Sequence, residues 1–128
     1  MSIHNSFTIC WQNRISEVCM RTIFLMLAAH YLADLALQGD FVATYKVQYL
    51  GKERKFNPIW YHVLLGHCMF HALGIYLSTG SLLLAVAELG AHFVIDYIKG
   101  REWIGFNLDQ ALHIACKLIW YILLTWCL

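Results

Sequence analysis

Four apolar stretches of the sequence each contain two histidine or aspartate side chains that are four residues apart. The pairs are His30 and Asp34, His67 and His71, His92 and Asp96, and Asp109 and His113. In an α-helix this spacing puts both members of a pair on one face. Neutral imidazole offers a nitrogen donor and aspartate an anionic oxygen, and zinc binds both donors in proteins. The spacing therefore predicts helices that bring their polar faces together around a metal ion.

The candidate ligands outnumber those that one ion needs. The candidate metal ligands are His30, Asp34, His67, His92, Asp96, Asp109 and His113. Four of them could hold one divalent ion, zinc in the first place, with an open position, and the whole set could hold two. The candidate catalytic residues are His67, His71 and Lys99. Either histidine could act as a general base, and the lysine is expected to steer an anionic group near the mouth of the site.

The segments that carry these residues have the composition of membrane helices. Apolar residues make up 60% of the 128 residues and charged residues 13%, whereas soluble domains average roughly 45–50% and about 25%. Four helices are expected, each nearly long enough for a hydrocarbon core of about 30 Å. Their approximate ranges are 20–38, 58–78, 82–99 and 107–128.

The fold class that follows is all-α, a polytopic membrane four-helix bundle with a short interfacial helix between helices one and two. The alternative is a soluble helical domain buried in an oligomer, whose helices would keep one polar face. The last helix argues against this alternative, because residues 118–126 are apolar on all sides. Glu88 and Lys117 are expected to lie at the same depth in the bundle, one layer further from the basic loops than the four pairs. They are therefore expected to form a buried ion pair.

The chain is expected to form one domain with an extension. Residues 1–19 are interpreted as an N-terminal extension, with translation starting at Met20, or as a tail along the membrane interface. Residues 20–128 form the single transmembrane domain.

The connections between the helices contain recognisable start and stop signals. Asp40 is expected to begin an interfacial helix that runs through Tyr49 and ends at Gly51. Pro58 suits the first turn of the second long helix. Residues 79–81, Thr-Gly-Ser, predict a tight turn, and Asn107 is expected to cap the last helix.

The distribution of lysine and arginine predicts the orientation. In an up-down bundle the loop 39–57 and the turn 100–105 share a side, which with Lys99 holds six basic residues, whereas the other side holds Arg14 and Arg21. The positive-inside rule then puts the basic loops in the cytoplasm and both termini in the periplasm, as in a multi-pass inner-membrane protein. This topology places seven of the eight paired residues in the cytoplasmic half of the bilayer and His71 near its middle.

Several of these motifs occur together in one known family. Residues 29–38 fit the pattern A-H-x-x-A-D-x-x-L-Q, His92, Asp96 and Lys99 fit H-x-x-x-D-x-x-K, and Asp109, Gln110 and His113 fit D-Q-x-x-H. In this order, over residues 20–127, the chain resembles the domain of unknown function 3307 family of small bacterial and phage membrane proteins. The resemblance implies a multi-pass membrane fold and a chain that begins near its first helix, but no chemistry.

The leading hypothesis is an integral membrane protein with an intramembrane metal site, and the candidate activity is metal-dependent hydrolysis of a lipid-linked or other anionic amphiphile. The expected partners are the lipid bilayer, such a substrate and, in an oligomer, further copies of the chain. A net charge of +1 gives no basic field for nucleic acid. The alternatives are a metal-ion or proton transporter or channel component, a bis-histidine haem protein, and a non-catalytic membrane partner whose polar residues only join its helices.

Overall fold

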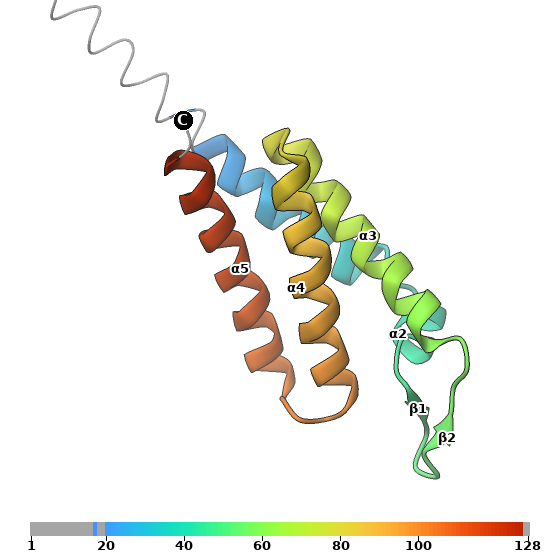
Figure 1. The fold of residues 1–128 in the computed structure, drawn as a ribbon. Coiled ribbons are helices and arrows are strands. Elements are labelled where there is room, and N and C mark those ends of the chain that lie inside the picture. Colours follow the sequence, from blue (N-terminus) through green and yellow to red (C-terminus); the bar gives the residue numbers. More distant parts are fainter. Residues whose placement is uncertain (1–16, 18–19, 127–128) are drawn as a thin grey trace, which may run out of the picture.

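The computed structural model describes residue 17 and residues 20–126, and they are mostly helical (Figure 1). The first helix comprises residues 20–31 and continues as the π-helical turn η1 (Leu32–Ala36). After it come the elements α2 (Asp40–Tyr45), β1 (Tyr49–Leu50), β2 (Lys55–Phe56), α3 (Trp60–Thr79), α4 (Leu82–Gly100) and α5 (Phe106–Trp126). The prediction of an all-α fold is confirmed. The predictions for residues 1–19 fall, apart from residue 17, outside the described residues.

The long helices run up and down. The start of the first helix and the end of α5 lie at one end of the molecule, and α2, the hairpin and the α4–α5 loop lie at the other (Figure 1). The predicted turn at residues 79–81 joins α3 to α4. Gly80 adopts a φ of 72°, a left-handed conformation that glycine tolerates, and its N–H donates to the Tyr76 carbonyl over 2.7 Å. The Ser81 hydroxyl accepts from the Leu84 N–H over 3.3 Å and so caps α4.

The first helix approaches α3 very closely at one point. A Cβ atom on Gly74 would lie 2.8 Å from the Ala29 Cβ, so the crossing requires a glycine there. The residue after Ala29 is His30, and its Nδ1 lies 3.4 Å from the Nδ1 of His71 on α3. The glycine therefore lets two helices bring their histidines within hydrogen-bond distance.

The first helix ends in a π-helical turn instead of continuing to Gln38. The Leu37 N–H donates to the Leu32 carbonyl over 3.0 Å, five residues back. Such turns widen a helix locally and are frequent at functional sites. This one carries Asp34.

The segment after α2 differs from the prediction. The short helix predicted to begin at Asp40 ends at Tyr45, not Tyr49, and residues 49–56 form an antiparallel hairpin. The Asn57 side chain causes the early stop, because its amide donates to the carbonyls of Tyr45 and Val47 over 2.7 and 3.0 Å. Gly51, expected to end a helix, begins the hairpin turn with a φ of 63°.

Two other helix starts also differ. Pro58 lies in the turn before α3, which begins at Trp60, because the Asn57 side-chain oxygen accepts from the Ile59 N–H over 3.2 Å and shapes that turn. Asn107 lies inside α5, which begins at Phe106, so it does not cap the helix.

The interior is unusually polar and the outside unusually apolar. Of the described residues that are buried, nine are apolar and ten are polar or charged. The apolar core of Met26, Ile75 and Leu84 is small. Large apolar side chains are exposed on every long helix, among them Phe24, Met69, Leu83 and Ile122. A soluble domain has the opposite arrangement.

Within the described residues, one helix, α5, is long and apolar enough to cross a membrane by length and composition alone. The lower hydropathy of α3 and α4 has a visible cause. Both helices carry ionisable side chains on the face that points into the molecule, namely His67, His71, Glu88, His92 and Asp96.

Candidate metal centre

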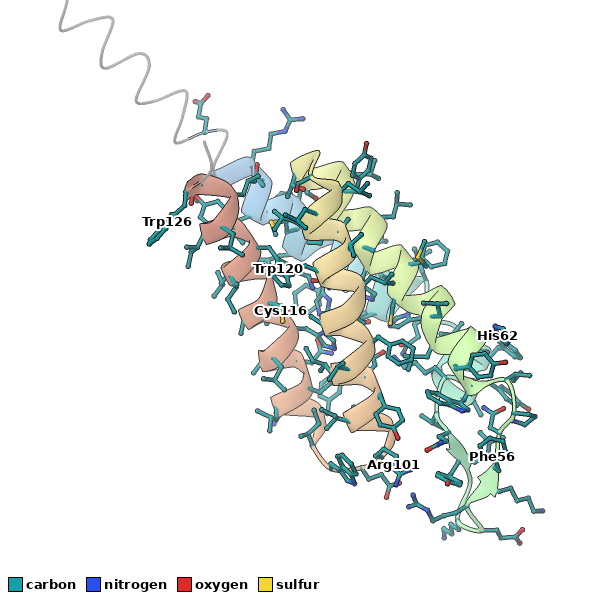
Figure 2. The ribbon with its side chains drawn as sticks, in the orientation of Figure 1. Phe56, His62, Arg101, Cys116, Trp120 and Trp126 are labelled. Atoms are coloured by element: carbon teal, nitrogen blue, oxygen red, sulfur yellow. The ribbon has the colours of Figure 1, made fainter. Side chains whose placement is uncertain are left out.

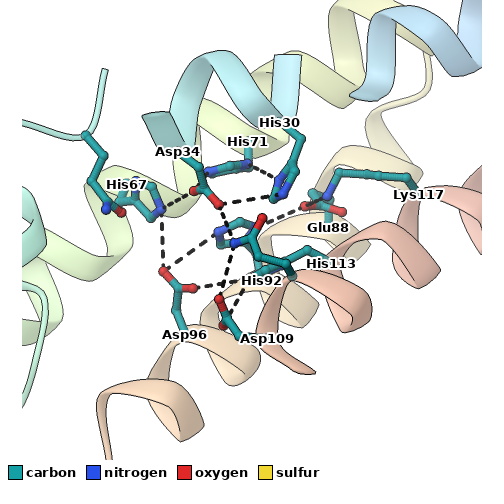
Figure 3. Close-up of polar contacts among 12 residues, drawn as sticks. His30, Asp34, His67, His71, Glu88, His92, Asp96, Asp109, His113 and Lys117 are labelled. Atoms are coloured by element: carbon teal, nitrogen blue, oxygen red, sulfur yellow. Dashed lines mark hydrogen bonds and ion pairs between the residues drawn. The ribbon is translucent and has the colours of Figure 1, made fainter. Parts of the chain in front are cut away.

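Every long helix contributes to one polar cluster in the middle of the bundle (Figure 3). All eight members of the four predicted pairs belong to it. Seven of them are buried, and the eighth, Asp34, has a side chain that is 12% exposed. The structure thus brings together all seven candidate metal ligands and both candidate histidine bases.

Asp34, on the π-helical turn, organises one half of the cluster. Its Oδ1 lies 3.2 Å from the Nε2 of His67 and 3.1 Å from the Nε2 of His71. Its Oδ2 lies 3.6 Å from the Nε2 of His30. Gln110 on α5 donates to this second oxygen over 3.2 Å and so links α5 to the first helix.

Asp96 on α4 stands between this half and the rest of the cluster. Its Oδ2 lies 3.4 Å from the Nε2 of His67, and its Oδ1 lies 3.2 Å from the Nε2 of His113. The Nε2 of His113 is also 3.5 Å from Oδ1 of Asp109, and the Nε2 of His92 is 3.8 Å from Oδ2 of Asp96. The two oxygens of Asp96 therefore face histidines of two different helices, α3 and α5.

Four histidine nitrogens at the centre approach carboxylate oxygens without making hydrogen bonds, whereas the Nε2 of His113 is within hydrogen-bond distance of Asp96. Within the described part of the chain, the buried Nε2 atoms of His30, His67, His71 and His92 have no hydrogen-bond partner, although carboxylate oxygens lie 3.1–3.8 Å away. Buried polar atoms in proteins rarely lack a hydrogen-bond partner. A tetrahedral zinc ion with bonds of 2.0–2.1 Å holds its ligand atoms about 3.3 Å apart. The observed spacing matches ligands that surround a common ion.

Two groups of donors have the compactness that a metal ion needs. One consists of Asp34, His67, His71 and His92, and the other of His92, Asp96 and His113, with all chosen donor atoms of a group within 4.8 Å of one another. The cluster could therefore hold a metal ion. His71, predicted as a base, belongs to a donor group, whereas His30 and Asp109 lie beside the groups rather than in them.

Glu88 fixes the orientation of His92. Its Oε1 lies 3.2 Å from the His92 Nδ1 and accepts from the Lys117 ammonium over 2.6 Å, and its Oε2 accepts from the Trp120 indole over 2.7 Å. Because a carboxylate can only accept, the Nδ1 carries the proton, and the Nε2 of a neutral ring keeps its lone pair toward the centre. The predicted buried Glu88–Lys117 ion pair is confirmed.

A cleft of about 540 Å³ leads from the cluster to the end of the molecule that holds α2 and the hairpin. Asp34, Asp96 and Asp109 line it, and Lys46 and Lys99 are on its walls. Lys99, predicted near the mouth, therefore does line the entrance.

Sequence reasoning missed Lys46. Its ammonium donates to Asp96 over 2.7 Å and to Gln38 over 2.5 Å. Lys46 follows α2 directly, in a basic loop that gave no signal beyond its charge. Gln110 appeared in a motif without a role, and in the structure it joins Asp34 to Asp109.

The comparison with family models agrees with the resemblance drawn from the motifs. The model described as "Protein of unknown function (DUF3307)" matches residues 22–128. No curated protein and no solved structure matches the chain.

The Glu88–Lys117 pair predicts an asymmetric response to mutation. We expect Glu88→Gln and Lys117→Met each to destabilise the fold, by about 3–5 kcal/mol, because each leaves one buried charge unpaired. The double variant should recover most of that loss, since it removes both charges. Thermal unfolding of purified variants measures this.

The exposed pair of Lys55 and Glu53, at 2.9 Å, provides the matched control. Lys55→Met should change the unfolding midpoint very little, because water screens an exposed pair. If the double variant lost as much stability as the two single variants together, the interpretation of Glu88 and Lys117 as a buried charge pair would be contradicted.

Proposed function

The chain belongs to the DUF3307 family, whose description states no function, and we therefore propose one from the site itself: a membrane-embedded metal-binding protein that hydrolyses an anionic, lipid-linked phosphoester. The observation that carries the proposal is the set of buried histidine nitrogens without hydrogen-bond partners that converge on aspartate oxygens. Structural ion pairs alone would leave no such set.

Zinc fits the donors best. Five histidines and three aspartates line the cluster, and zinc prefers this mixture of nitrogen and oxygen ligands, whereas magnesium and calcium prefer oxygen alone. Asp34, Asp96 and Asp109 supply the negative charge that a dication needs in a medium of low dielectric constant.

The exposed surface supports a multi-pass arrangement in the membrane. Helices α3, α4 and α5 contain 20, 19 and 21 residues, so each reaches about 30 Å at 1.5 Å per residue, the thickness of the hydrocarbon core. Their exposed faces are apolar, as lipid requires. The polar faces that lower the average hydropathy of α3 and α4 point inward, where polar side chains of membrane bundles are found.

The two ends of the bundle differ in charge. Arg101 and the hairpin lie at one end and Trp126 at the other (Figure 2). The basic end also carries Lys46 and Lys99. The proposed orientation puts this end, with the cleft, in the cytoplasm and both termini in the periplasm.

Reporter fusions test this orientation. A reporter that is active only in the periplasm should be active after Leu128 and inactive when inserted into the hairpin turn between Lys52 and Glu53. A reporter active only in the cytoplasm should give the reverse pattern. Opposite results at the two positions would overturn the orientation, and equal results would overturn the up-down topology.

Metal content tests the central part of the proposal. Protein purified in detergent after metal-replete expression should contain at least one equivalent of zinc by elemental analysis. The variant His92→Ala/Asp96→Ala should contain none, because it removes a donor from each group. His62→Ala, which changes an exposed histidine on the outside of α3 (Figure 2), should keep the metal. Wild-type protein without stoichiometric metal would refute the proposal.

The walls of the cleft suit hydrolysis of a phosphoester. A bound divalent ion supplies Lewis acidity and a nucleophilic water at neutral pH. Lys46 and Lys99 place positive charge on the route to the cluster and would bind the anionic head group. Gln38 and Gln110 add neutral donors on the same walls.

A second cavity suits a hydrocarbon tail. An apolar groove of about 240 Å³ lies between the first helix, α2 and α3, and His67 of the cluster is one of its walls. Helix α2 separates it from the cleft: Phe41 and Val42 line the groove, whereas Ala43 lines the cleft. An amphiphile with an anionic head and an apolar tail matches this pair of cavities.

Gly66 allows the tail site to be tested. A Cβ atom there would meet nothing within 4 Å, so Gly66→Leu would fill the groove without a clash with the backbone. We expect zinc-loaded protein to hydrolyse a long-chain phosphoester with KM raised about tenfold by this change, which displaces roughly two methylenes at about 0.8 kcal/mol each. A short, water-soluble phosphoester should be unaffected.

Gly90→Leu on the exposed side of α4 is the control, because a Cβ there also meets nothing within 4 Å. Equal effects of the two variants on long-chain KM would contradict the tail site. Failure of zinc-loaded wild-type protein to cleave either ester would contradict the hydrolase.

The structure gives the other candidate functions less support. A transporter needs a polar path through the bundle, but beyond Glu88 and Lys117 the described interior is the apolar core of Met26, Ile75 and Leu84. A bis-histidine haem needs a porphyrin between two rings. The ring centroids of His71 and His92 are 3.6 Å apart and those of His92 and His113 are 4.0 Å apart, which leaves no such space.

A further inference from the structure

We propose that the cluster is a pair of adjacent cation sites joined by Asp96 as a bridging carboxylate. This inference rests on the metal-binding function proposed above and specifies the number of ions and the residues that hold each one. It starts from the position of Asp96, whose two oxygens face different sets of histidines (Figure 3).

The first site lies between the first helix and α3. Oδ1 of Asp34 is 3.2 Å from the Nε2 of His67 and 3.1 Å from the Nε2 of His71, and the Nε2 of His67 is 3.4 Å from Oδ2 of Asp96. These three separations, 3.1–3.4 Å, are those of neighbouring tetrahedral zinc ligands. Asp34, His67 and His71 belong to one compact donor group, and Asp96 stands next to it through its contact with His67. The Nδ1 of His71 contacts the Nδ1 of His30, on the side of the His71 ring away from Asp34. This contact orients the His71 ring so that its Nε2 points at Asp34.

The second site lies between α4 and α5. The Nε2 of His113 is 3.2 Å from Oδ1 of Asp96 and 3.5 Å from Oδ1 of Asp109. The Asp109 oxygen is buried and has no hydrogen-bond partner among the described residues. His92 lies between the two sites: its Nε2 is 3.8 Å from Oδ2 of Asp96, the oxygen that faces the first site, and it shares a compact donor group with Asp96 and His113. Asp109, which stands outside the compact donor groups, thereby gains a role.

The link between the sites is the carboxylate and not the shared histidine. His92 belongs to both compact groups, but its Nδ1 is held by Glu88, so the ring has only Nε2 for an ion. Asp96 has an oxygen for each site. A carboxylate bridge fits two ions about 3.5–4 Å apart, the separation found in hydrolytic two-metal centres.

The charges favour an anionic ligand between the ions. Two dications carry +4, and Asp34, Asp96 and Asp109 carry −3, while Glu88 and Lys117 neutralise each other. A hydroxide or a phosphate oxygen would balance the remaining positive charge. Lys46, with a side chain 17% exposed on the cleft, then competes with the first ion for Oδ2 of Asp96 and can swing toward an incoming anion.

Counting ions in variants tests the inference, with zinc alone as the probe. Wild-type protein in detergent should bind two equivalents by equilibrium dialysis and elemental analysis. His71→Ala should lose the first ion and His113→Ala the second, so that each variant retains one equivalent. His62→Ala should retain two. One equivalent in the wild type would overturn the inference but leave the proposed function intact, whereas none would overturn both.

A spectroscopic measurement on the wild type avoids any effect of mutation on folding. With Mn²⁺ in place of zinc, two ions that share Asp96 should give an exchange-coupled electron paramagnetic resonance spectrum, and His71→Ala should give the six-line spectrum of an isolated ion. A six-line spectrum from wild-type protein saturated with Mn²⁺ would contradict the bridged pair. Loss of both ions from a variant that keeps the helical content of the wild type by circular dichroism would contradict two separate donor sets.

Discussion

The rest of the structure depends on the requirement that ionisable groups inside the bundle find partners on other helices. A charge buried without a partner costs several kcal/mol, so each polar side chain restrains the helix that faces it. Asp34 ties the first helix to α3, Asp96 ties α4 to both α3 and α5, and Glu88 ties α4 to α5. With only a small apolar core, these contacts determine how the helices are arranged about the centre.

The sequence was sufficient to predict the members of the cluster, because helix periodicity determines which side chains share a face. Pairs such as His92 and Asp96 could be found by spacing alone, and the common depth of the pairs followed from the up-down order of the helices. The same reasoning predicted the contact of Glu88 with Lys117. The bounds of α3 and α4 and the start of α5 were predicted to within about two residues for the same reason.

What could not be predicted depends on contacts between residues outside the regular helices. The hairpin forms because Asn57 captures the carbonyls of Tyr45 and Val47, and an asparagine gives no sign in the sequence of which carbonyls it will reach. Lys46 follows α2 directly, and its contact with Asp96 spans 50 residues of sequence. The π-helical turn at Asp34 has no established sequence signature, although it sets the direction of the carboxylate.

The arrangement also connects metal binding with stability. Carboxylates and histidine nitrogens gathered inside the bundle oppose folding, because their charges and lone pairs lose water and gain incomplete partners. A cation at the centre would turn the same groups into ligands, and its binding energy would add to the folding energy. The same buried carboxylates and imidazoles would then both lower the stability of the metal-free protein and give the site its affinity for a cation. A chain whose middle is occupied by polar side chains can keep only a small apolar core, and this one places that core at the end of the bundle opposite the cleft.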